Sequence, residues 1–337
     1  MRSPSPIVVD KFGGSVLTRP EDIAAAVEVV VAQRKAGLRP VVVVSAFEGV
    51  TDTILSSAAV LLPDGGAGLR GEGAHAPDSA LARETDRALA TGEALSAALF
   101  ALGLEARGLP ARSFSGAEAG IRTAAAHLGA AVRRVYSRPL RTAVADGLVP
   151  VVAGFQGVGA HGELTTLGRG GTDLSAVALA VALRADHCAL FKDVGGVWEA
   201  DPHLVPGARL LPSVGALQLE LLGELGAEVV HPVAVRRARR GRLRLTVRSL
   251  DEAAPATEVL PRVAKDEVEP LVLAVDRKER IARISLVGPA SRMPELLPLP
   301  AHGEGSFDEG GLRVVWAEVP VSQAAQAAQA VHAGVMA

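Results

Sequence analysis

Cysteine, aromatic residues and net charge are all scarce in this chain of 337 residues. The single cysteine, Cys188, excludes an internal disulfide framework, and its place in an apolar stretch favours a core side chain over a nucleophile. Aromatic residues make up 3% of the chain and hydrophobic residues 49%, so the core must be aliphatic. Because one cysteine cannot form a disulfide within the chain, we expect a reducing compartment and a cytoplasmic location.

The formal net charge is only -2, and residues of both signs are mixed along the chain. This balance gives no electrostatic argument for a nucleic-acid partner. The one basic run, Arg236-Arg237-Ala238-Arg239-Arg240, is too short to change that view and is typical of a solvated helix face.

Long hydrophobic runs are also missing. The longest apolar stretch, Ala176 to Leu183, ends before Arg184 and Asp186 and is too short to span a membrane. The N-terminal residues lack a basic segment followed by an apolar one, so we expect no signal peptide and no membrane partner.

Glycine, in contrast, gathers at particular points, above all in Leu167-Gly168-Arg169-Gly170-Gly171-Thr172-Asp173. The apolar strand pattern from Val149 to Phe155 precedes this stretch, and an apolar helical run from Leu174 to Leu183 follows it. Glycines let the backbone approach a ligand, and the following helix presents free N–H groups and its positive end. The stretch therefore predicts an anion-binding turn, with an ordinary turn as the alternative.

A second glycine turn follows the first predicted strand, Ile7 to Val9, in Lys11-Phe12-Gly13-Gly14-Ser15. It is no Walker A loop, because the lysine precedes the glycines, but it is similar to a phosphate site at a strand end. The apolar strand Val41 to Val44 leads into a polar loop, residues 45–52. Strand and helix patterns alternate throughout, which predicts an α/β fold with a largely parallel sheet covered on both faces.

Three further stretches carry expectations. Glu93 lies among small and apolar neighbours, so a buried carboxylate there needs a cation or hydrogen-bond donors. The loop after the strand Cys188 to Phe191 contains Trp198, which could cover a purine ring or pack in the core. Residues 63–79 lack periodicity and favour a mobile surface segment or lid.

The length allows one large α/β domain and a smaller one. We expect a linker over residues 251–270, where charge, proline and alanine alternate. Beyond it, strand patterns at 271–276, 281–287 and 312–319 and a helical pattern at 322–333 predict one small α+β module.

Taken together, the chain resembles the aspartate kinases of the amino acid kinase superfamily. The resemblance rests on ordered motifs: Lys11 to Ser15, Val44 to Asp52, Gly92 to Ser96, Gly168 to Asp173, Asp193 to Val197, Ala200 to Pro202, and Gly226-Ala227 with His231-Pro232. It implies a three-layer α/β/α sandwich over residues 1–250, a linker over 251–270 and a single ACT-like regulatory module over 271–337. It also implies a homodimer or higher homo-oligomer.

The resemblance implies a role for each matched residue. Lys11 would neutralise the transferred phosphoryl group, Gly13, Gly14 and Ser15 would let the backbone approach the nucleotide phosphates, and Asp173 would organise the lysines. Arg169 would hold the α-carboxylate of L-aspartate, and Glu93, with Ser45 and Thr51, would receive its amino group. ATP would lie along Lys192, Asp193 and Trp198, with Asp201 and Glu228 near the nucleotide.

The implied reaction moves the γ-phosphoryl group of ATP to the β-carboxylate of L-aspartate, the first step towards lysine, threonine and methionine. That carboxylate is already ionised at neutral pH, so it needs positioning and charge neutralisation rather than a general base. We expect Mg²⁺ to arrive with ATP, since none of the eight histidines has metal-ligand spacing.

The chain departs from the family pattern at Glu228, where a lysine is usual near the nucleotide phosphates. Lys192 stands where threonine is common, and we hypothesise that it supplies the missing positive charge. The tail has room for one ACT-like module where the family generally has two, so we expect weak or absent feedback inhibition. Two alternatives stay open: a kinase for a related acidic substrate, and a family member without catalytic activity.

Overall fold

The computed structural model describes residues 5–62, 79–226, 229–251, 253–263, 271–272, 276–278, 281–295, 297, 299 and 303–336. The chain forms two compact units. The first comprises residues 1–193 and 248–252, and the second comprises residues 194–247 and 253–337. The predicted lid, residues 63–79, lies outside the described residues except for Ser79.

The first unit is built on five parallel strands in the order β9-β1-β2-β6-β3. Their bounds are β1 Ile7–Phe12, β2 Arg39–Val44, β3 Ala111–Phe114, β6 Val149–Ala153 and β9 His187–Phe191. Every residue of β1 and β6 is buried, as is all of β2 beyond its first residue. This burial explains their near-continuous apolar sequences, because both faces of a parallel sheet are covered.

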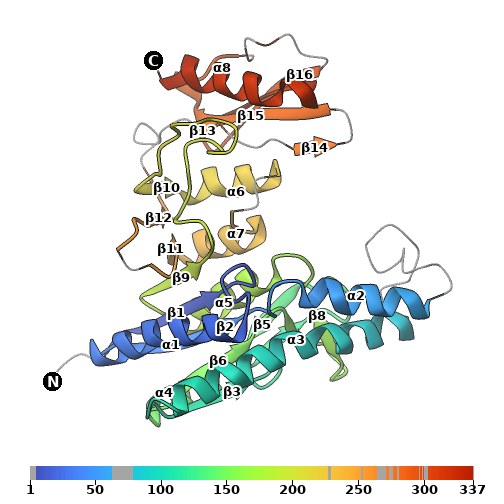
Figure 1. Cartoon of the computed structure of the whole chain (residues 1–337), viewed down its shortest axis with the longest axis vertical. Helices are drawn as coiled ribbons and strands as arrows, with labels where there is room; N and C mark the ends of the chain where they lie inside the picture. Colours follow the sequence, from blue (N-terminus) through green and yellow to red (C-terminus); the bar gives the residue numbers. More distant parts are fainter. Residues whose placement is uncertain are drawn as a thin grey trace. The chain divides into compact units, whose positions relative to one another are not determined.

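Helices cover the two faces of these strands (Figure 1). On one face, α1 (Pro20–Lys35) and α3 (Ala80–Glu105) enclose an aliphatic core around Phe12, Val42 and Val44. Helix α5 (Gly171–Leu183) packs on β1, β2 and β9, and α4 (Arg138–Ala145) on β6. Helix α2 (Val50–Leu61) contacts α3.

Side chains alternate between the faces of a strand, and this alternation decides which residues of β1 face which helices. Phe12 belongs to the core under α1 and α3, so Lys11, its neighbour, faces the opposite side, where α5 packs.

The first unit also contains a small four-stranded sheet in the order β5-β4-β7-β8. Its strands are β4 Ile121–Thr123, β5 Val132–Val135, β7 Gln156–Val158 and β8 Leu164–Thr166. The sequence patterns did not predict this sheet, because strands of three or four residues contain too few alternations to be recognised. Strand β8 leads directly to the Gly168–Gly170 turn.

In the second unit, β12 (Thr257–Leu260) pairs with β10 (Ser213–Gly215) and β11 (Arg244–Arg248), next to helices α6 (Ala216–Glu224) and α7 (Pro232–Gly241). The segment predicted to be a linker, residues 251–270, therefore contains a strand.

The C-terminal sheet of the second unit has the order β13-β15-β17-β16, with β14 pairing to β15. Its strands are β13 Leu271–Val272, β14 Asp276–Lys278, β15 Ile281–Pro289, β16 Gly303–Glu309 and β17 Leu312–Pro320. Short 3₁₀ helices at Ala290–Arg292 and Val321–Gln323 precede β16 and α8 (Ala324–Met336). The predicted α/β class with a small α+β C-terminal module is confirmed, although β16 was not anticipated.

Among the described residues, one helix, α3, is long and apolar enough to cross a membrane by length and composition alone. Half of its most apolar window is buried inside the protein, and the core helix of a soluble protein passes the same test.

Candidate active site

A buried cluster of three charges lies at the carboxyl ends of β1 and β9. Lys11, only 5% exposed, places its Nζ 2.8 Å from Oδ1 of Asp173 in the first turn of α5. Lys192 follows β9 and places its Nζ 3.1 Å from the other oxygen, Oδ2. Phe12 and Phe191 are register partners in the sheet, which brings the residues around these two strand ends together. One carboxylate thus holds two ammonium groups, and the cluster keeps one net positive charge.

The environment of this cluster shifts the pKa values of Asp173 and Lys11. Burial alone would raise the pKa of Asp173, but the ammonium groups of Lys11 and Lys192 outweigh burial and hold that pKa well below its usual range. Burial lowers the pKa of Lys11, while attraction to Asp173 opposes that change. A negatively charged ligand next to the lysines would favour their charged forms further.

The turn after β1 packs so closely against its neighbours that its two glycines leave no space for a side chain. A Cβ at Gly13 would lie 2.8 Å from Nζ of Lys11, and one at Gly14 would lie 3.1 Å from the carbonyl oxygen of Ala46. Ser15, the next residue, is exposed. Bare backbone therefore borders the buried lysine, as close approach of a phosphate requires.

The position of Lys192 depends on a distant part of the chain. Its backbone N–H donates to the carbonyl oxygen of Arg248 at 2.9 Å, and the Arg248 guanidinium lies 5.5 Å from the centre of the Phe191 ring. Residues 248–252 return to the first unit after the chain has passed through the second.

The Gly168–Gly170 turn carries Arg169 as an exposed side chain. Gly168 and Gly170 have φ values of 73° and 70°, in the left-handed region that other residues rarely adopt, and Gly170 is the N-cap of α5. Arg169 is four residues from Asp173, so their Cα atoms are separated by at most about 14 Å. Because Asp173 contacts Lys11, the structure brings Arg169 and Lys11 to the same end of the first unit.

Asp86 of α3, which the sequence analysis missed, fixes the base of this turn. It is fully buried, and its carboxylate accepts hydrogen bonds from the Thr166 hydroxyl at the end of β8 and from the Leu128 N–H at 3.1 Å. Nδ1 of His127 lies 2.7 Å from the same carboxylate. The carbonyl oxygen of Thr166 in turn accepts N–H groups of residues 129 and 130. The only sequence signal was an aspartate on the same helix face as Glu93, seven residues earlier.

Glu93 is 3% exposed and lies beside the loop that follows β2. Helix α3 comes so close to this loop that a Cβ at Gly92 would be 2.8 Å from Cβ of Ala46. Burial raises the pKa of Glu93 to about 7, partly offset by a hydrogen bond from the Ala46 N–H. Half-buried Ser45 donates its N–H to the carbonyl oxygen of Phe12 at 3.0 Å, which ties the same loop to the end of β1. Thr51 is half-buried in the first turn of α2.

A second buried carboxylate, Asp10, lies on the other face of β1 from Lys11 and is fully buried. Burial raises the pKa of Asp10 to about 7, and Gln33 and Arg248 only partly offset this change. Asp10 therefore differs from Asp173, whose two lysine partners stabilise its ionised form.

The residues predicted to hold the nucleotide are spread over both units. Lys192 belongs to the cluster described above, and the exposed Asp193 is the last residue of its segment of the first unit. In the second unit, Trp198 is half-buried against the core of the C-terminal sheet and α8. Asp201 accepts the N–H of His203 at 2.9 Å within a turn. Glu228 lies outside the described residues.

Within the described part of the chain, no three histidine, cysteine, aspartate or glutamate side chains are grouped as a metal site. The cluster itself is basic, and it suits the phosphate groups of a nucleotide better than a bare cation.

The parallel sheet between helices, the lysine-glycine turn at the end of β1 and the second glycine turn before α5 define a class of phosphoryl-transfer enzymes. The family model "Amino acid kinase family" matches residues 6–249. The chain belongs to this family, and the three-layer fold expected from the sequence is confirmed.

Within the family, the similar proteins are aspartokinases. Aspartokinase 2 of Bacillus subtilis is 36% identical over 290 residues, which cover 86% of this chain and 67% of that protein. The aspartokinase of Mycolicibacterium smegmatis is 39% identical over 286 residues, covering 84% and 64%. The matched part spans about two thirds of the length of these relatives.

Solved structures of aspartokinases share the fold of this chain. Aspartokinase III of E. coli, in complex with aspartate and ADP, matches with a TM-score of 0.79 over 98% of this chain, at 20% identity. The aspartate kinase from Synechocystis matches with a TM-score of 0.63 at 30% identity, covering 97% of this chain and 55% of its own.

Proposed function

We propose that this protein is an aspartate kinase, which transfers the γ-phosphoryl group of ATP to the β-carboxylate of L-aspartate. The observation that carries the proposal is the buried Lys11–Asp173–Lys192 cluster beside bare glycine backbone. Its similarity to aspartokinases supports the choice of substrate. The product would be 4-phospho-L-aspartate, which places the protein in amino-acid biosynthesis.

In this proposal, the cluster stabilises the charge that develops on the transferred group. In the transition state, the transferred phosphoryl group spreads negative charge over three oxygens. Fixed cations in a site with little water stabilise that charge strongly. Asp173 holds both lysines in place through ion pairs, and its charge opposes the lowering of the Lys11 pKa by burial. Mg²⁺ on the nucleotide phosphates would supply further neutralisation.

The acceptor would be oriented by groups from two loops and two helices. Arg169 can bind both oxygens of the α-carboxylate through its planar fork. Glu93 would receive the amino group, with Ser45 and Thr51 nearby. Because the pKa of Glu93 is about 7, an arriving ammonium group would favour its ionised form and release a proton at neutral pH.

Lys192 would neutralise part of the negative charge of the nucleotide phosphates. Its ammonium group lies on the same carboxylate as that of Lys11, so a phosphate near Lys11 would also be near Lys192. This arrangement supports the hypothesis that Lys192 replaces the cation expected at Glu228. Asp193, Trp198 and Asp201 are proposed to complete the nucleotide site. We also propose a cytoplasmic homo-oligomer with weak or absent feedback inhibition by lysine or threonine.

The decisive experiment is a coupled ADP-release assay on the full chain with aspartate, glutamate or no acceptor. We expect release only with aspartate, together with an acyl phosphate that hydroxylamine traps. Faster release with glutamate would identify a related kinase. No release with any acceptor, despite binding of MgATP by calorimetry, would identify a non-catalytic family member.

A further inference from the structure

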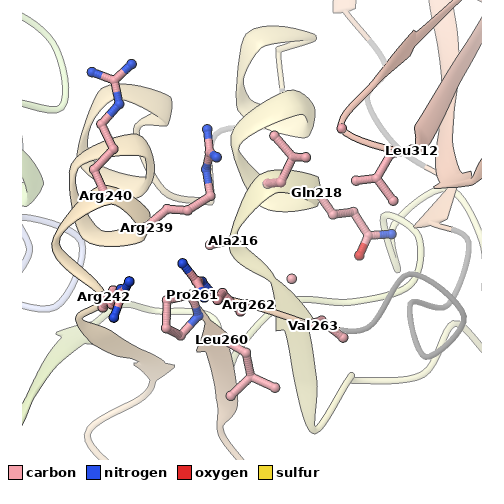
Figure 2. A pocket seen from close by; sticks show the side chains of 13 residues that line it. Ala216, Gln218, Arg239, Arg240, Arg242, Leu260, Pro261, Arg262, Val263 and Leu312 are labelled. Atoms are coloured by element: carbon pink, nitrogen blue, oxygen red, sulfur yellow. The ribbon is translucent and has the colours of Figure 1, made fainter.

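A basic pocket in the second unit is independent of the residues proposed for catalysis. The cavity measures about 510 Å³, a volume typical of sites for small ligands. Figure 2 shows Arg239 and Arg240 on α7, Arg242 after the end of that helix, and Arg262 beside Pro261. We call this cavity, lined by four arginines, the basic pocket.

Three of its arginines have no counter-charge among the described residues. Arg239 forms an ion pair with Glu220 at 2.9 Å, which neutralises it in place. In the part of the chain that the structure describes, no carboxylate pairs with Arg240, Arg242 or Arg262, and all three are exposed. Three unpaired guanidinium groups around one cavity favour a ligand with at least two negative charges.

The backbone adds to this preference. Gly215, Ala216, Leu217 and Gln218 line the pocket and form the start of α6. No described side chain caps this helix end, so the N–H groups of Ala216 and Leu217 and the positive end of the helix dipole are available to a ligand. Backbone N–H groups next to arginine forks match the several acceptor oxygens of a phosphate group.

The rest of the lining is apolar. The apolar side chains of this lining are Leu260, Pro261, Val263 and Leu312. Leu217 packs closely on Gly310, since a Cβ added at Gly310 would lie 2.4 Å from Cδ2 of Leu217. The pocket therefore joins α6, α7, the end of β12 and the turn before β17. A concave site of this size, in a chain with a net charge of -2, suits a small molecule rather than a nucleic acid.

We infer that the basic pocket binds a small phosphorylated metabolite with at least two phosphate charges, as an effector site separate from the catalytic cluster. The ligand bridges the arginines of α7 and Arg262 across the N-terminus of α6. Polycarboxylates share part of this chemistry, and the experiment separates them. The inference concerns binding and does not depend on the proposed kinase activity.

The test is calorimetry on the full chain with pyrophosphate, inorganic phosphate and citrate as probes. We expect pyrophosphate to bind at least tenfold more tightly than the other two. The double variant Arg240→Ala/Arg262→Ala, which changes exposed side chains only, should weaken pyrophosphate binding at least tenfold. The matched control Arg133→Ala/Arg138→Ala removes two exposed arginines of the first unit and should change affinity less than twofold.

Binding at the catalytic cluster is distinguished by Lys11→Met. If pyrophosphate binding is lost in Lys11→Met but kept in the Arg240→Ala/Arg262→Ala variant, the inference is overturned. It is equally overturned if pyrophosphate does not bind at all, or if citrate binds more tightly. Pyrophosphate binding that survives Lys11→Met and fails in the double arginine variant supports it, whether or not the chain phosphorylates aspartate.

Discussion

The two basic regions of this molecule are built in opposite ways. In the first unit, Lys11 and Lys192 are largely shielded from water and share Asp173. In the second unit, Arg240, Arg242 and Arg262 are exposed and pair with no described carboxylate. A buried cation requires a partner because desolvation is costly, whereas an exposed arginine remains solvated until a ligand arrives. The difference separates a preorganised site, suited to catalysis, from one suited to reversible binding.

The largest effect should come from removing the shared partner. Asp173→Asn leaves two buried ammonium groups without a carboxylate, so we expect the free energy of unfolding to fall by about 3–5 kcal/mol. Urea denaturation measures this loss. Arg262→Ala is the matched contrast from the exposed region and should change stability by less than about 0.5 kcal/mol. Equal losses in the two variants would contradict the comparison.

Loss of the buried cation should affect chemistry more than folding. Lys11→Met removes a fixed charge from the proposed transition state, and we expect kcat for aspartate phosphorylation to fall about 10²–10³-fold. The coupled ADP-release assay measures kcat, and circular dichroism checks the fold. Arg133→Ala, on the exposed strand β5, serves as the control and should keep full activity. A Lys11→Met enzyme with normal kcat would refute the catalytic role.

Arg169 tests whether an exposed arginine can also serve substrate binding. Arg169→Lys keeps the charge but loses the two-pronged contact, so we expect KM for aspartate to rise about 10–100-fold. KM for MgATP should change little. The same steady-state kinetics at varied aspartate and varied MgATP measure both constants, and an equal rise in the two would show that Arg169 does not act on the amino acid.

Asp10 extends the comparison to a buried carboxyl group whose pKa is raised rather than lowered. Its pKa is about 7 in the folded protein and has an ordinary value of 3.8. Between these values the folded state keeps a proton that the unfolded state has lost, so stability falls as pH rises. The contribution of this one group is about 1.4 kcal/mol per pH unit.

The variant Asp10→Asn removes that contribution. We expect the fall in unfolding free energy from pH 5 to pH 6 to be smaller in the variant by about this amount, as measured by urea denaturation at each pH. Asp22→Asn is a suitable control, since Asp22 belongs to the exposed start of α1. An unchanged pH dependence in Asp10→Asn would show that the carboxyl group is solvated.

How much of this could be predicted depends on how local each feature is. Lys11 and the glycine turns were recognised from short motifs, because a lysine beside paired glycines already suggests phosphate chemistry, whereas the role of Asp173 was implied only by the resemblance to aspartate kinases. The contact of Lys192 with Asp173 could not be derived from residues 19 positions apart, since it requires the register of β9 against β1. Asp86 was missed for the same reason, because its partners come from a loop and from β8.

The arginine run was predicted to be a solvated helix face, and this interpretation was incomplete. Arg236 and Arg239 instead reach Glu220 of α6, and Arg240 lines a pocket together with Arg262. Residues from distant segments meet there only after α6, α7 and β12 have packed. The large sheet was predictable because its strands are continuous apolar runs, whereas the short strands β4, β5, β7 and β8 carried no such signal.

The hydrogen bond from the Lys192 N–H to the Arg248 carbonyl has a consequence for the order in which the protein matures during translation. A nascent chain that ends at Asp193 already contains Lys11, Asp173 and Lys192, yet it lacks the carbonyl group that anchors the last of them. The ribosome must synthesise the intervening segment before that anchor exists. Transfer activity should therefore emerge late in synthesis, and a fragment released at the first crossing between the units should be inert.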